Sequence, residues 1–137
     1  MKWSTIPCPF SRCSCAGAFD GVMTIDAMEN VPPEDWPRVL ANLHRALRPG
    51  GHLYLTVEET AAAEIDAAFA RARAKGLPVE RGEVVEGETA GYHYYPGRDR
   101  VIAWLGAAGF AVVEEAFDQQ DGWGYRHLLV GDTAGQP

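Results

Sequence analysis

The chain has 137 residues, a length typical of one domain that buries roughly two-thirds of its unfolded surface. Its formal net charge of −7 argues against nucleic acid or an anionic membrane as the main partner, because both bind through a basic footprint. No apolar run approaches the roughly 18 residues of a membrane span. The first residues lack the continuous apolar stretch of a signal peptide, so we expect a cytoplasmic protein.

Residues 1–18 show neither helical nor strand periodicity, which predicts an irregular N-terminal arm. Three cysteines, Cys8, Cys13 and Cys15, lie close together in this arm. Three is an odd number for a disulfide framework, and the nearest histidine, His44, falls inside a predicted helix. Free thiols are therefore favoured over a metal site, which would need a fourth ligand at a reasonable distance.

The first regular elements are a strand, a helix and a second strand. A short apolar run predicts a buried strand over Gly21–Ile25. Asp35 can cap a helix over Trp36–Arg48, and Pro49-Gly50-Gly51 can end it. A strand rich in Leu, Tyr, Thr and Val follows over His52–Val57. The helix carries one apolar stripe at i+3 and i+4 spacing, made of Trp36, Val39, Leu40, Leu43 and Leu47.

The second half of the chain continues the alternation. An alanine-dense helix is predicted over Thr60–Lys75 and a further helix over Arg98–Ala108. Between them, Val79–Tyr95 suggests one or two short strands or an excursion over the sheet. Two final strands, Phe110–Phe117 and Tyr125–Val130, are joined by a turn-rich link that is short enough for an antiparallel hairpin.

This order predicts an α/β fold with a parallel core and one antiparallel edge hairpin. The expected strand order is the Val22 strand, the Leu53 strand, the Tyr125 strand and, outermost, the Ala111 strand. We expect residues 19–132 to form the domain and residues 133–137 to form a tail.

Four short stretches carry a family resemblance: Phe19–Val22, Ile25–Val31, Leu47–Gly51 and Ala107–Phe110. Together they resemble the C-terminal half of a class I S-adenosylmethionine-dependent methyltransferase, and most closely the small-molecule branch often called type 11. The resemblance spans nearly the whole chain, from about Phe19 to Gly131.

The resemblance implies a Rossmann-like, three-layer fold whose seven-stranded sheet is only partly present here. This chain would supply the fourth to seventh strands. The first three strands, with the glycine-rich loop and the acidic residue for the ribose, have no counterpart before Phe19. S-adenosylmethionine is therefore the cofactor expected of the intact family, whereas this chain is expected to bind it weakly or not at all.

The resemblance also implies site residues. Ile25, Asp26 and Ala27, at the end of the fourth strand, would lie beside the cofactor. Family members often have Glu-His where this chain has Glu29-Asn30. The implied reaction is an in-line transfer of a methyl group from a sulfonium to a nucleophile, which demands mainly correct placement and exclusion of water. The methyl acceptor would be a small molecule.

Other polar residues have two interpretations each. Asp26 could equally be a polar residue that caps the turn after the strand. For Glu58 and Glu59, a solvated strand end is favoured over a ligand-binding site. His93, Tyr94 and Tyr95 could line a substrate pocket, with His93 transferring a proton. An aromatic strand packed on a helix is the favoured alternative for this stretch.

Two functions remain open from the sequence. The chain is either a truncated and inactive methyltransferase, or a non-catalytic interaction or scaffold module that self-associates. In both cases the Gly21–Ile25 strand would present an unpaired apolar edge, which predicts a homodimer through that edge. The alternative is that the arm residues Trp3–Phe10 fold back along it.

Overall fold

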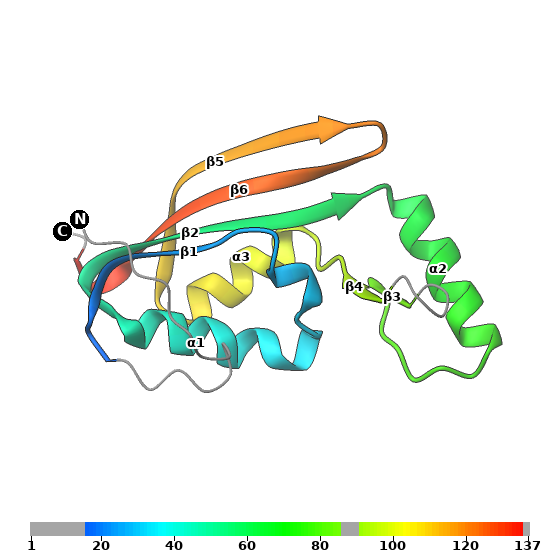
Figure 1. The fold of residues 1–137 in the computed structure, drawn as a ribbon, viewed down its shortest axis with the longest axis horizontal. Helices are drawn as coiled ribbons and strands as arrows, with labels where there is room; N and C mark the ends of the chain where they lie inside the picture. Colours follow the sequence, from blue (N-terminus) through cyan, green and yellow to red (C-terminus); the bar gives the residue numbers. More distant parts are fainter. Residues whose placement is uncertain (1–15, 86–90, 136–137) are drawn as a thin grey trace.

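The computed structural model describes residues 16–85 and 91–135. Its main sheet has four strands in the order β1-β2-β6-β5 (Figure 1). The predicted α/β fold and strand order are therefore confirmed, with one parallel pair, β1–β2, and two antiparallel pairs. The prediction of free thiols at Cys8, Cys13 and Cys15 lies outside the described residues.

Strand β1 (Phe19–Thr24) is parallel to β2 (Leu47–Thr60), with Val22 opposite Leu53. Val22 and Thr24 are buried, but Ile25, which we expected to end this strand, lies beyond it and is 54% exposed. The strand stops early because the chain turns at Asp26, which adopts the left-handed conformation with φ 53°. In the described part of the chain, β1 pairs along one edge only.

Helix α1 (Trp36–Ala46) buries the predicted apolar stripe. It ends two residues before the expected Arg48, because Arg48 precedes a proline and is disfavoured in the helical conformation. Leu47 instead opens β2 opposite Phe19. Asp35 precedes the helix without capping it, and its carboxylate accepts a hydrogen bond from Arg38 at 2.8 Å.

Helices α1 and α3 (Arg98–Ala107) cover one face of the sheet. Trp36 is fully buried between them and stacks on Trp104, with ring centroids 5.3 Å apart. The strand residues that fill this core alternate along the chain: Val22, Leu53, Leu55, Val57, Leu128 and Val130.

The opposite face of the sheet carries a second ladder of cross-strand neighbours. Met23 lies opposite Tyr54, Tyr54 opposite Leu129, and Leu129 opposite Glu114. Met23 is 48% exposed and Glu114 is exposed. We call this side the open face, since α1 and α3 pack on the other one.

The C-terminal hairpin is longer than predicted. Strands β5 (Phe110–Gln120) and β6 (Trp123–Asp132) are joined by only two residues, Asp121 and Gly122, both left-handed with φ 44° and 89°. That combination is typical of a tight type I′ turn. Arg126 of β6 then ties three strands together, because it donates to Glu59 and Glu115, each at 2.6 Å.

The remaining elements gather beyond the end of β2 (Figure 1). Helix α2 (Ala62–Ala74) packs on β3 (Glu83–Val85), which pairs with β4 (Tyr92–Tyr94) in a separate two-stranded sheet. The expected tail begins with a short 3-10 helix, Thr133–Gly135. Among the described helices, none is both long enough and apolar enough to span a membrane.

Candidate functional site

The C-terminal ends of β1 and β2 lie side by side, as they do in every parallel pair, and acidic residues follow both. Asp26 comes two residues after β1, and Glu58 lies near the end of β2. In open α/β sheets, ligands bind outside the carboxyl ends of the parallel strands. This edge is therefore the first place to look for a site.

Asp26 is held in its unusual backbone conformation by two hydrogen bonds. Its backbone N–H donates to Thr56 Oγ1 at 2.9 Å, and its Oδ1 accepts from the Tyr125 hydroxyl at 2.8 Å. A left-handed aspartate costs free energy, and such residues persist where the surroundings hold them in place, often at binding sites. The Asp26 side chain also interacts with the side chain of Glu29.

The three residues that the resemblance assigns to the cofactor, Ile25, Asp26 and Ala27, form the turn that follows β1. Ile25 and Asp26 are exposed, and Ala27 is half-buried. They thus lie at the strand end where the prediction put them. Their contact with a cofactor stays a prediction.

Glu29 was noted in the sequence only as part of the Glu29-Asn30 pair and was not among the expected site residues. It lies in the 3-10 helix Met28–Asn30 and is only 5% exposed. Its Oε2 has no hydrogen-bond partner among the described residues. Burial raises the pKa of Glu29, and the neighbouring carboxylates of Asp26 and Glu58 raise it further.

Glu58 joins this acidic group to the second sheet. Its carboxylate lies 3.7 Å from Nε2 of His93 on β4. Burial raises the pKa of Glu58 and the charge of Asp26 adds to it, whereas His93 acts in the opposite direction. We call Asp26, Glu29 and Glu58 the acidic cluster.

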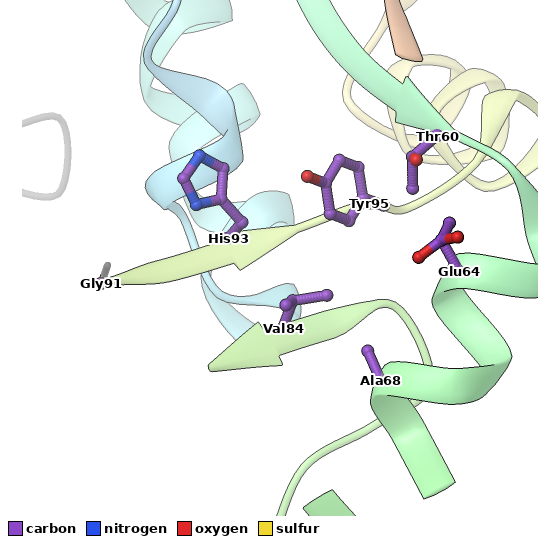
Figure 2. A pocket seen from close by; sticks show the side chains of 7 residues that line it. All are labelled: Thr60, Glu64, Ala68, Val84, Gly91, His93 and Tyr95. Atoms are coloured by element: carbon purple, nitrogen blue, oxygen red, sulfur yellow. The ribbon is translucent and has the colours of Figure 1, made fainter. Parts of the chain in front are cut away.

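A pocket of about 250 Å³ opens between β2, α2 and the two-stranded sheet (Figure 2). His93 and Tyr95 line it from the side of the two-stranded sheet, and their stacked rings have centroids 6.2 Å apart. Glu64 lines it from α2. His93 therefore contributes to the pocket and also approaches the acidic cluster. The lining residues are Thr60, Glu64, Ala68, Val84, Gly91, His93 and Tyr95.

Tyr94 does not share this pocket, although the sequence groups it with His93 and Tyr95. Because alternate residues of a strand point to opposite sides, Tyr94 turns into the core, where it is 1% exposed beside Trp36. Its hydroxyl accepts a hydrogen bond from Arg100 at 2.9 Å. The favoured aromatic-strand interpretation thus describes Tyr94, while His93 and Tyr95 line a pocket.

The site offers carboxylates that accept hydrogen bonds, the imidazole of His93 and the aromatic ring of Tyr95. In residues 16–85 and 91–135, no group of acidic, His or Cys side chains could hold a metal ion. Such a lining suits a small polar molecule, with carboxylates to accept its hydrogen bonds and His93 to take up or release a proton.

The raised pKa of Glu29 predicts how stability depends on pH. The folded state keeps this carboxyl protonated at a pH where the unfolded chain has ionised it. Its contribution to stability is therefore complete below the ordinary pKa of 4.5 and is lost as the pH rises through the folded pKa. Glu29→Gln should consequently be more stable than the wild type at pH 7.5, by on the order of 1 kcal/mol.

Urea denaturation at pH 4 and pH 7.5 measures this effect, and the advantage of Glu29→Gln should shrink at the lower pH. Glu114→Gln is the matched control, because this substitution removes the same charge at an exposed position on β5. An advantage of Glu29→Gln that is equal at both pH values would contradict the assignment.

Comparison with known proteins identifies the fold. Residues 11–115 match the family of methyltransferase domains. Among solved structures, a methyltransferase from Methanosarcina mazei described as S-adenosylmethionine-dependent superposes with a TM-score of 0.76 at 14% identity, over 90% of this chain and 64% of that one. No curated protein matches the sequence.

Two further structures were solved with a bound cofactor product. The 1,6-didemethyltoxoflavin-N1-methyltransferase of Burkholderia thailandensis, with S-adenosylhomocysteine, has a TM-score of 0.68 at 18% identity, over 93% of this chain and 50% of that one. The magnesium protoporphyrin IX methyltransferase of Synechocystis PCC 6803, also with S-adenosylhomocysteine, has a TM-score of 0.62 at 14% identity. The match covers 93% of this chain and 49% of that one.

This chain thus spans between about half and two-thirds of the length of these structures. The family match covers most of its residues, and the sheet order and connections agree with it. The chain belongs to the methyltransferase-domain family and has the fold of class I S-adenosylmethionine-dependent methyltransferases.

Proposed function

We propose that this chain is the acceptor-binding half of an S-adenosylmethionine-dependent methyltransferase that acts on a small molecule, and that it is inactive by itself. The observation that carries the proposal is the pairing of the acidic cluster with the adjoining pocket at the ends of β1 and β2. In this fold class, that edge of the sheet is where ligands meet.

The described residues supply only one flank of a cofactor site. Ile25, Asp26 and Ala27 would border S-adenosylmethionine, but the turn after β1 leads into a three-residue 3-10 helix with no side-chain cap. Among the described residues, no glycine-rich strand-to-helix turn is available to hold the cofactor.

The residues of this chain would instead position the acceptor. Tyr95 would stack on its body, the acidic cluster would orient its polar group, and His93 would accept a proton from a protonated nucleophile. The roles of Tyr95 and His93 rest on their places in the lining of the pocket, and the role of the acidic cluster rests on the 3.7 Å distance between Glu58 and His93.

The test compares the chain with a longer polypeptide. If the coding DNA just upstream of Met1 encodes a strand followed by a glycine-rich loop, that segment is expressed with the chain. Transfer of a radioactive methyl group to small amines, phenols and carboxylates is then measured. We expect label transfer only with the longer polypeptide. Transfer at an equal rate by the chain alone would overturn the proposal.

A second candidate, a non-catalytic scaffold that self-associates, is favoured by the edge of β1 with which no strand in the described residues pairs. Met23 in β1 and Ile25 just after it are 48% and 54% exposed, and β1 itself contains no proline or lysine. Antiparallel pairing of two copies of β1 about a two-fold axis would satisfy the backbone groups of both edges. The occupant that we propose for this edge is a second copy of the chain.

Sedimentation at micromolar concentration tests this second candidate. We expect a species of twice the 14.9 kDa chain mass. Met23→Lys should give the monomer, because a charged side chain beside the edge opposes pairing. Val85→Lys is the control, since Val85 is equally exposed but lies on β3. A wild-type protein that sediments only as a monomer would refute the dimer.

A further inference from the structure

We propose that the pocket between β2, α2 and the two-stranded sheet binds a flat aromatic ring with a neutral O–H or N–H donor, such as a small phenol, and that His93 accepts its hydrogen bond. This inference deepens the proposed function, because it names the chemical class of the acceptor. It rests on that function only where the bound ring is identified as the molecule that receives the methyl group.

The wall of the pocket selects a flat body. The rings of His93 and Tyr95 both line the space, at an angle of 18° to each other and with centroids 6.2 Å apart (Figure 2). Val84, which pairs with His93 across the two-stranded sheet, and Ala68 of α2 supply the apolar part of the lining. An aromatic ligand can stack on this wall and gain more than it would from apolar burial alone.

The size of the pocket limits the ligand to about one ring. Its volume of about 250 Å³ lies below the roughly 300–1,000 Å³ that is typical of pockets for drug-sized ligands. The side chain of His93 is 41% exposed, so a substituent on the far side of the ring can extend into solvent.

His93 is the acceptor because Glu58 orients its imidazole. Nε2 of His93 lies 3.7 Å from Oε2 of Glu58. A carboxylate in this position favours the tautomer with the proton on Nε2, and a neutral imidazole then keeps Nδ1 as its acceptor. Within residues 16–85 and 91–135, no hydrogen-bond donor to Nδ1 is found. A hydroxyl or N–H group at the edge of a bound ring would supply that donor.

The charges around the pocket favour a neutral ligand. Among the described lining residues there is no Lys or Arg to pair with an anion. Glu64 is the one carboxylate among them, and it is exposed, so water and salt screen its charge. Glu58 does not line the pocket, and its carboxylate lies against Nε2 of His93. The hydrogen bond to His93 therefore orients the ring more than any charge does.

The ligand 4-ethylphenol tests this inference, together with two molecules of similar size that each lack one of its features. The ether 4-ethylanisole keeps the flat ring without the donor, and 4-ethylcyclohexanol keeps the hydroxyl without the flat ring. Each is titrated into the full chain at pH 7.5 without S-adenosylmethionine, and backbone amide shifts are followed by NMR. We expect saturable shifts at Ala68, Val84 and His93, with 4-ethylphenol bound at least about threefold more tightly than either of the others.

Two variants separate the hydrogen bond from the stacking. His93→Phe keeps a ring but removes the acceptor, so it should bind 4-ethylphenol and 4-ethylanisole equally well. Tyr95→Leu removes part of the aromatic wall and should lose the preference for 4-ethylphenol over 4-ethylcyclohexanol. His52→Phe is the matched control, because it makes the same change at an exposed position of β2 outside the pocket lining and should leave every affinity unchanged. Circular dichroism verifies that each variant is folded.

The inference is overturned if the wild type shows no saturable shift, if it binds either of the other two molecules as tightly as 4-ethylphenol, or if the preference over 4-ethylanisole survives in His93→Phe. Tighter binding of phenethylamine than of 4-ethylphenol would also overturn it, because a charged group would then be recognised instead of a neutral donor. The assay involves no methyl transfer, so its outcome is separate from that of the proposed function. Binding of 4-ethylphenol could be as expected even if the longer polypeptide methylates nothing, and the longer polypeptide could label an amine even if 4-ethylphenol does not bind.

Discussion

Trp36→Ala should destabilise the protein by about 3–5 kcal/mol, a large share of the roughly 5–15 kcal/mol that holds a domain of this size folded. Trp36 is fully buried, stacks on Trp104 and meets the edge of the Tyr94 ring. Its indole N–H also donates to the carbonyl of Val31 at 3.1 Å. Truncation would thus remove the centre of the packing between α1, α3 and the sheet.

The free energy of unfolding in urea measures this effect. Trp123→Ala is the matched control, because Trp123 is 42% exposed at the start of β6 and contacts only the neighbouring Tyr125 ring among the described aromatic pairs. Its loss should cost no more than about 1 kcal/mol. A similar loss in the two variants would show that the core is not organised around Trp36.

Two glycines only three residues apart should respond to alanine in opposite directions. Gly109, after α3, has φ +97°, and a Cβ there would lie 2.9 Å from Nε2 of His44. Nε2 of His44 in turn lies 3.0 Å from Asp132 Oδ1. Gly109→Ala should therefore cost about 2–3 kcal/mol, from backbone strain and the displaced imidazole.

Gly106 lies inside α3, and a Cβ there would meet nothing within 4 Å. Gly106→Ala should stabilise the protein by about 0.5–1 kcal/mol, because alanine loses less backbone freedom in a helix. Thermal unfolding of both variants measures the two effects: the melting temperature should fall in Gly109→Ala and rise in Gly106→Ala. Equal melting temperatures would contradict the described end of α3.

The fold was largely predictable from periodicity and turn residues. The stripe of α1 and the alternation of strands and helices depend on residues close in sequence, and both predictions are confirmed. The boundaries were less predictable, because tertiary pairing decides them. Leu47 joins β2 since Phe19 lies opposite, and the Asp121-Gly122 pair shortens the hairpin turn to two residues.

The candidate site was predictable in part. The end of the first strand indicated Asp26, and the aromatic run indicated His93 and Tyr95, whereas the sequence favoured a solvated strand end for Glu58. Glu29 was not predicted because its burial arises from the packing of its 3-10 helix against β2 and β4, which are distant in sequence. The strand alternation that sends Tyr94 into the core depends on the exact bounds of β4, Tyr92–Tyr94.

The most direct test of the account is a calorimetric titration of the folded chain with S-adenosylmethionine. The given sequence has no glycine-rich motif before Phe19 of the kind that approaches a cofactor closely, and it has no Asp or Glu there that could bind a ribose. We therefore expect no saturable heat, or a dissociation constant weaker than about 1 mM, which corresponds to about −4 kcal/mol. A micromolar dissociation constant would contradict the proposal that this chain supplies only the acceptor-binding half.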